Sequence, residues 1–250
     1  MTLWLVRAGR YGEREQMAAD KGLVIIGWED MPDLGKLKTR NELTELLSET
    51  YPDKKKNALR NWEAQLWAFS KTIQPGDLVA MPLKSRRAIL FGTVTGDYKY
   101  EPLFPAEFKH TRPVKWQHEI PRNRIDQDLL YKFGATMAVC KIEKDNAENR
   151  IKALLSGKLK PAGELVPMPD TGSDEALDLE QYARDQISDA IIRAFKGHKL
   201  AHLTAAVLQA QGYKVRVSPE GPDGGVDIIA GRGPLGFEPP RLVVQVKSSD

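Results

Sequence analysis

Two segments decide the fold of the C-terminal part: Gly221-Pro-Asp-Gly-Gly-Val-Asp227 and Arg241-Leu-Val-Val-Gln-Val-Lys247. The second segment is apolar and rich in β-branched residues, which predicts a strand. Side chains alternate between the two faces of a strand, so Gln245 and Lys247 should share one face. The opposite face should contribute to a core through Leu242, Val244 and Val246.

A second short strand is predicted over residues 227–230, Asp-Ile-Ile-Ala. The glycine pair at 224–225 allows a tight turn in which backbone approaches closely. If this strand pairs with residues 241–247, three polar groups converge. They are the carboxylate of Asp227, the amide of Gln245 and the ammonium of Lys247.

These groups suit the hydrolysis of a phosphodiester, because a hard divalent cation neutralises charge, generates hydroxide and assists the leaving oxygen. In this scheme Asp227 holds Mg²⁺, and the side-chain oxygen of Gln245 and the main-chain carbonyl of Val246 complete the protein ligands. Lys247 positions water or stabilises the developing negative charge, and Asp223 is a spare carboxylate. Since glutamine carries no charge, such a site should bind metal more weakly than one with two acidic residues.

The order of helix, Gly-Tyr, strand, Gly-Pro-Asp-Gly-Gly-Val-Asp and strand with Gln-Val-Lys runs from His198 to Asp250. It resembles the catalytic domain of Mrr-type restriction endonucleases, a glutamine-containing branch of the PD-(D/E)XK nucleases. The resemblance implies an α/β nuclease core, DNA as substrate, and catalytic roles for Asp227, Gln245 and Lys247.

The chain departs from that family in two places. Many PD-(D/E)XK enzymes carry a glutamate on the first core helix, whereas the helix predicted over residues 200–211 has no acidic residue. The chain also ends three residues after Lys247, where the family fold continues with a helix and a further strand. The resemblance therefore implies a C-terminal truncation, with DNA binding retained and cleavage weakened.

The N-terminal part predicts several short strands and few helices. A helix is indicated over residues 57–73 and a shorter one over 145–156. This pattern favours a closed, barrel-like sheet, so the whole chain is predicted to be α+β. The predicted strands span residues 3–7, 22–28, 78–81, 88–94 and 137–142.

Residues 1–143 resemble the PUA-like and EVE-like barrels, which recognise modified bases. The resemblance is carried by Trp4-Leu-Val-Arg-Ala-Gly9, Gly27-Trp28, Gln74-Pro-Gly-Asp-Leu-Val79, residues 92–100 and Arg112-Pro-Val-Lys-Trp116. It implies a pocket in which aromatic rings stack on an extruded base. The candidate pocket residues are Trp28, Tyr98, Tyr100 and Trp116, with Asp30 or Arg7 as readers of the base edge. Trp116 and Trp4 have an alternative role in the barrel core.

Proline, glycine and small polar residues mark residues 159–177 as a linker. The predicted organisation is a modified-base-sensing domain over 1–158 and a nuclease domain over 178–250. The second domain should begin with a helix capped by Asp178, with Gln181 three positions later.

The chain has 250 residues, 41% hydrophobic and 28% charged, which is typical of a soluble globular protein. It has no apolar run long enough for a membrane span and no signal peptide, which favours the cytoplasm. Net charge is +3, and clusters such as Lys54-Lys-Lys56 and Arg112-Pro-Val-Lys115 are candidate phosphate contacts. The single cysteine, Cys140, excludes an internal disulfide.

These observations predict a modification-dependent, type IV-like DNA restriction endonuclease that uses Mg²⁺ and acts in phage defence. Cutting both strands needs two sites, which favours a homodimer or a higher oligomer. Two alternatives remain open. One is a modified-nucleic-acid-binding protein that does not cleave, and the other is a nuclease triggered by a nucleotide signal or modified RNA.

Overall fold

The computed structural model describes residues 1–143, 146–156, 178–219 and 225–247. These residues form two compact units, Met1–Tyr182 and Ala183–Asp250, and the division falls inside helix α6 (Leu179–Ala194). The linker predicted over residues 159–177 lies outside the described residues.

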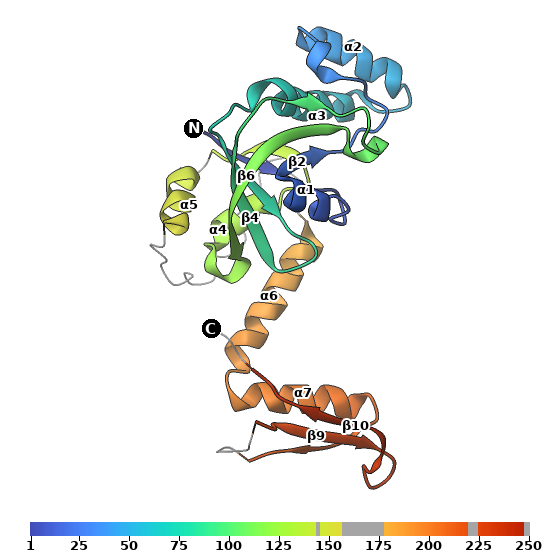
Figure 1. Ribbon diagram of the computed structural model, residues 1–250, viewed down its shortest axis with the longest axis vertical. Helices are drawn as coiled ribbons and strands as arrows, with labels where there is room; N and C mark the ends of the chain where they lie inside the picture. Colours follow the sequence, from blue (N-terminus) through green and yellow to red (C-terminus); the bar gives the residue numbers. More distant parts are fainter. Residues whose placement is uncertain (144–145, 157–177, 220–224, 248–250) are drawn as a thin grey trace. The chain divides into compact units, whose positions relative to one another are not determined.

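The first unit is built on a seven-stranded sheet, whose hydrogen-bonded order is β2-β6-β4-β3-β1-β7, with β5 paired to β6 (Figure 1). Strands β1 and β3 are parallel, and the other pairs are antiparallel. The strands are β1 Leu3–Val6, β2 Leu23–Ile26, β3 Leu78–Pro82, β4 Ala88–Val94, β5 Lys99–Tyr100, β6 His110–Pro121 and β7 Val139–Lys141.

The α+β class is confirmed, but the predicted closure of the barrel is not. The sheet curls as a half-barrel, and its hydrogen-bonded order has two ends, at β2 and β7 (Figure 1). Buried side chains from both faces form the core of this unit, including Trp4 and Val79 on one side and Phe91 and Leu5 on the other.

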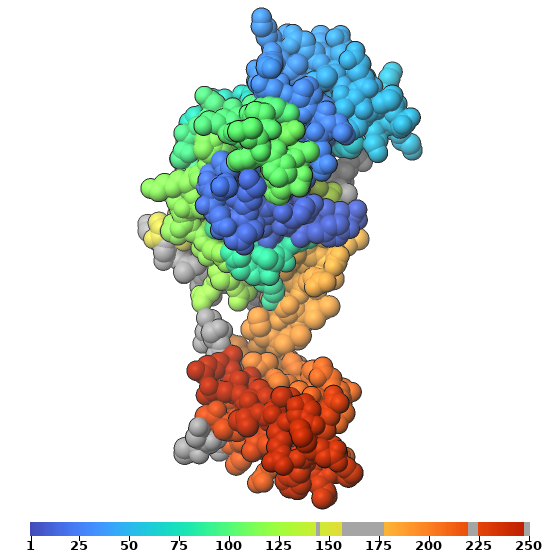
Figure 2. All heavy atoms as spheres, turned by 45° about the vertical axis from the view of Figure 1, so that its right-hand side comes forward, coloured from blue at the N-terminus to red at the C-terminus, as the bar shows by residue number. Residues whose placement is uncertain are grey.

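Seven α-helices and four shorter helical turns are found in the described residues. The predicted helix over 57–73 is α3, which continues into the π-helical turn η2, and the helix predicted over 145–156 is α5. Helices α2 and α3 pack against each other at one end of the first unit (Figures 1 and 2). The helices and helical turns of the first unit are α1 Glu15–Lys21, η1 Leu34–Lys36, α2 Arg40–Thr50, α3 Lys56–Trp67, η2 Ala68–Thr72, η3 Ala106–Phe108, η4 Arg122–Arg124, α4 Gln127–Phe133 and α5 Ala147–Leu155.

Arg112, expected to contact phosphate, is instead a structural residue of the first unit. It is 1% exposed, and its guanidinium donates hydrogen bonds to the carbonyls of Phe69 at 2.5 Å, Ser70 at 3.2 Å and Gly96 at 3.1 Å. The π-helical turn leaves carbonyls without helical partners, and a planar guanidinium with several donors satisfies them. Arg112 therefore ties η2 to β6.

The second unit contains helix α7 (His198–Ala210) and a three-stranded antiparallel sheet of order β10-β9-β8. Helix α7 packs on one face of this sheet through a small core around Ala201, Ala205 and Ile228. The other face is open, because Ile229 is 52% and Val243 68% exposed. The strands are β8 Lys214–Val217, β9 Ile228–Arg232 and β10 Glu238–Val244.

Candidate functional site

Asp227 and Gln245 lie at the same end of two paired strands. Strands β9 and β10 are antiparallel with Ile228 opposite Val244, and Asp227 directly precedes β9 while Gln245 directly follows β10. The amide of Asp227 donates to the carbonyl of Val244 at 3.0 Å, which extends the pairing by one residue. The predicted pairing of the two strands is thus present, and it brings the backbone of both residues together.

The carboxylate of Asp227 is held in place by the backbone of the neighbouring strand. The amide of Val246 donates to Asp227 Oδ2 at 2.7 Å, and the amide of Ser218 donates to the carbonyl oxygen of Asp227 at 2.8 Å. Hydrogen bonds of this kind to an acceptor carboxylate fix its orientation. Asp227 is therefore bound between β8 on one side and the end of β10 on the other.

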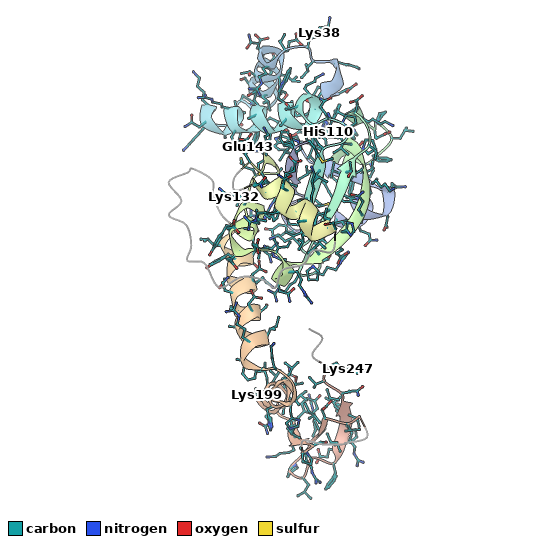
Figure 3. All side chains as sticks on the ribbon, turned by 90° about the vertical axis from the view of Figure 1, so that its left-hand side faces the viewer. Lys38, His110, Lys132, Glu143, Lys199 and Lys247 are labelled. Atoms are coloured by element: carbon teal, nitrogen blue, oxygen red, sulfur yellow. The ribbon has the colours of Figure 1, made fainter. Side chains whose placement is uncertain are left out.

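Gln245 and Lys247 share the exposed face, and Val244 and Val246 pack into the core beneath α7. This alternation is the one predicted from the sequence. Lys247 lies beyond the end of β10 (Figure 3), and it makes no ion pair with any residue that the structure describes. The residue itself is exposed.

Gly225 brings the turn before Asp227 against the side chain of Gln245. It has a φ of +86°, and a Cβ at this position would lie 3.3 Å from Gln245 Nε2. A positive φ with so close a neighbour favours glycine. The remaining candidate of this site, Asp223, lies outside the described residues.

The oxygen atoms at this strand end fit a hard divalent cation. Asp227 Oδ2 accepts the Val246 amide. Asp227 Oδ1, the amide oxygen of Gln245 and the carbonyl oxygen of Val246 are oxygen donors of the type that Mg²⁺ prefers. No group of three or more His, Cys, Asp or Glu side chains that could hold a metal occurs among the described residues. From the described residues, a cation here would have the Asp227 carboxylate and neutral oxygens as ligands.

In the first unit, Tyr98 and Tyr100 both contact His110, which is 1% exposed (Figure 3). Burial lowers the pKa of His110, so its imidazole is neutral at pH 7. The amide of Leu34 donates to the Tyr98 hydroxyl at 3.2 Å, and that hydroxyl lies 2.8 Å from His110 Nδ1. If the hydroxyl donates to Nδ1, the imidazole proton is on Nε2, which has no hydrogen-bond partner among the described residues.

Trp28 lies in a left-handed turn after β2, with a φ of +67°, and is half-buried. Its ring contacts Trp62 edge to face at 6.1 Å between centroids, and Trp62 contacts Tyr51 in the same manner at 5.2 Å. Asp30 is exposed, and its carboxylate interacts with the Tyr51 hydroxyl. Burial and this carboxylate raise the pKa of Tyr51 to about 12. Trp28, Asp30, Tyr51 and Trp62 form one group, called the Trp28 cluster below.

Two members of the Trp28 cluster were missed in the sequence. Trp62 lies on the apolar face of α3, where it is half-buried, packs against the core of the first unit and contacts the turn after β2. Tyr51 follows the last residue of α2 and had no periodic signal of its own. The aromatic character of both positions was the one available indication.

Trp116 and Arg7 have partners outside the Trp28 cluster. The indole of Trp116 donates to the carbonyl of Ala18 in α1 at 2.9 Å, and its ring packs in the core beside that helix. Arg7 is 9% exposed and pairs with Asp178 at 3.3 Å. Both side chains thus have structural contacts.

Residues 4–141 match the family model described as a domain of unknown function, DUF8426, which is more than half of the 250-residue chain. The chain belongs to this family. In this DUF8426 chain, residues 192–250 are similar to a second family model, described as restriction endonuclease. No curated protein matches the chain.

The second match spans α7, the three-stranded sheet and the Asp227 site, so the nuclease resemblance of this region is supported. The DUF8426 match supports no activity for the first unit, since its printed description assigns none. No helix in the described residues of this DUF8426 chain is both long and apolar enough to cross a membrane.

Proposed function

We propose that the chain is a modification-dependent DNA endonuclease that hydrolyses phosphodiester bonds with Mg²⁺. In this proposal residues 1–158 sense a modified base, and residues 178–250 cleave. The supporting observation is the hydrogen bond from the Val246 amide to Asp227, which holds the carboxylate at the strand end that carries Gln245 and Lys247. This strand end lies within the restriction-endonuclease match.

Each residue of the proposed active site has a separate task. Asp227, with the oxygens of Gln245 and Val246, would hold Mg²⁺, which supplies charge neutralisation and an activated water when bound. Lys247 places an ammonium with three donors on the exposed face, where it orients water or stabilises negative charge on a phosphate. The Val246 amide keeps Asp227 from turning away.

The sensing site proposed in the first unit uses the Trp28 cluster. The ring of Trp28 stacks on the modified base, and Asp30 accepts hydrogen bonds from its polar edge. Tyr98 and Tyr100 support the turn after β2 through His110 and Leu34. Trp116 and Arg7 are left out of this pocket because of their contacts with Ala18 and Asp178.

A cleavage assay tests the proposal with modified and unmodified duplexes, with and without Mg²⁺. Wild type should cut the modified duplex only with Mg²⁺, and Asp227→Ala should bind it without cutting. Glu238→Gln is a matched control, because it removes a carboxylate at the other end of β10, opposite Arg232. Binding by wild type without any Mg²⁺-dependent cleavage would instead identify a non-cleaving binding protein.

The proposed active form is a homodimer or a higher oligomer, because one active site cuts one strand. Sedimentation of the chain with and without modified duplex measures this directly. A monomer on the duplex that still makes double-strand breaks would contradict the proposed assembly.

A further inference from the structure

The loop over residues 8–14, between β1 and α1, is held in one conformation by its own backbone and side chains. The carboxylate of Glu13 accepts the amides of Arg10 at 3.3 Å and Tyr11 at 2.8 Å, and the amide of Arg14 donates to Ala8 at 2.9 Å. Gly9 has a φ of +98°, a conformation that L side chains rarely adopt. These hydrogen bonds therefore give the loop a defined conformation.

The tip of this loop carries an aromatic ring and a cation on the outside. Tyr11 is 78% exposed, and the guanidinium carbon of Arg10 lies 5.5 Å from the centre of its ring. Figure 2 shows the N-terminal segment, coloured dark blue, at the surface of the first unit. The carboxylate next to the tip, that of Glu13, has partners within the loop. It accepts the loop amides and lies 3.5 Å from Arg14.

Arg14 connects this loop to the turn that carries Trp28. Its Nε donates to the carbonyl of Glu107 at 2.7 Å, and a Cβ on Gly27 would lie 3.0 Å from Arg14 Nη2. Gly27 directly precedes Trp28. The root of the loop and the proposed base-binding turn are thus neighbours on the first unit.

We propose that the Arg10-Tyr11 tip is a second nucleic-acid contact of the first unit. The ring of Tyr11 stacks on a base or fills the space beside an extruded one, and Arg10 contacts a backbone phosphate. An aromatic face accepts any base, and an exposed arginine adds a charge-dependent contact that carries no sequence information. This inference rests on the proposed function, because the contact of Arg14 at the root of the loop with Gly27, which precedes Trp28, is what selects nucleic acid as the partner.

Equilibrium binding of the full chain to fluorescent duplexes in EDTA tests the tip without cleavage. Tyr11→Ala should weaken binding of the modified duplex roughly 5- to 150-fold, and Tyr11→Phe should stay within about twofold of wild type because stacking is retained. Arg10→Gln should reduce the slope of log affinity against log salt by about one.

Lys141→Gln is the matched control for charge. Lys141 is exposed on β7 opposite Trp4, whereas the loop follows Val6 at the other end of β1. This variant should bind the duplex as wild type does. Since Tyr11 and Lys141 are both exposed, circular dichroism should show the folded state for every variant.

The outcomes separate the inference from the proposed function. Preference for modified duplex by wild type, with unchanged binding by Tyr11→Ala and Arg10→Gln, overturns the inference alone. Equal binding of modified and unmodified duplex, weakened by Tyr11→Ala, overturns modified-base sensing and supports the tip as a contact. Loss of a protein–protein association in Tyr11→Ala, with DNA binding intact, would reassign the tip to a protein partner.

Discussion

Asp178 provides a quantitative test of how helix α6 is attached to the first unit. Its carboxylate accepts from Lys84 Nζ at 2.6 Å and lies 3.3 Å from Arg7, and its other oxygen accepts the amide of Gln181 at 3.1 Å. The last contact is the N-cap predicted from the sequence. Substitution Asp178→Asn removes the charge and retains an efficient capping residue, so the variant isolates the ion pairs.

The expected size of the effect follows from the pKa of Asp178. Burial opposes its ionisation, but Lys84, the Gln181 amide and Arg7 outweigh burial and lower the pKa from 3.8 to about 2. That difference corresponds to about 2.5 kcal/mol. The side chains of Lys84 and Asp178 are 24% and 15% exposed, respectively. Solvent screening therefore reduces the expected contribution of the ion pairs to the free energy of unfolding to about 1–2 kcal/mol.

The pH dependence has a defined sign. A carboxyl whose pKa is lower in the folded state stabilises the protein fully above its unfolded pKa, and the stabilisation is lost as pH falls through the folded value. The difference between wild type and Asp178→Asn should therefore be full at pH 7 and fall between about pH 4 and pH 2. At pH 3 it should be about half its value at pH 7.

Tryptophan fluorescence is the appropriate signal for urea unfolding. All five tryptophans of the chain, Trp4, Trp28, Trp62, Trp67 and Trp116, lie in the first unit, so the transition reports on that unit alone. Asp53→Asn, at an exposed carboxylate between α2 and α3, is the control and should leave stability within about 0.5 kcal/mol of wild type. Equal stability of wild type and Asp178→Asn at pH 7, or a difference that persists unchanged at pH 3, would refute the reasoning.

Two further substitutions test the second unit and the core of the first. Gln245→Glu places a second carboxylate beside Asp227 and should tighten Mg²⁺ binding at least about tenfold in calorimetric titration, an effect that Asp227→Ala should abolish. Arg112→Met leaves the carbonyls of Phe69, Ser70 and Gly96 without their donor and should cost about 2–4 kcal/mol of unfolding free energy by tryptophan fluorescence. A loss below about 1 kcal/mol would show that these carbonyls find other partners.

The second unit could be predicted from the sequence because its information is local. Strands β9 and β10 are close in the chain, and the alternation of Val244, Gln245, Val246 and Lys247 determines the faces without knowledge of any distant residue. Helix α7 ends two residues before Gly212, whose φ of +88° is a conformation that glycine adopts readily after a helix. Metal binding by this region stays a prediction.

The first unit was predicted less well because its central strand lacks an alternating pattern. Strand β6 pairs with β2, β4 and β5, yet it contains two prolines and a buried arginine, and none of the strands predicted from the sequence covers it. Arg112 looked like a surface cation since the sequence does not reveal that η2 presents carbonyls to it. Without β6 at its true length, the order and openness of the sheet could not be derived.

Trp28 and Tyr11 differ in how far contacts within the first unit account for their conformation. Trp28 in a left-handed turn costs about 1–3 kcal/mol, and an edge-to-face contact such as that with Trp62 returns about 0.5–1.5 kcal/mol in addition to the burial of its ring. Its conformation is thus largely explained by packing within the unit. Tyr11 is different, because its ring contact among the described residues is with Arg10, and the loop that presents it includes a glycine with a φ of +98°. The exposed ring of Tyr11 on an ordered loop is therefore an argument for an external binding partner. It is a stronger argument than the backbone strain at Trp28.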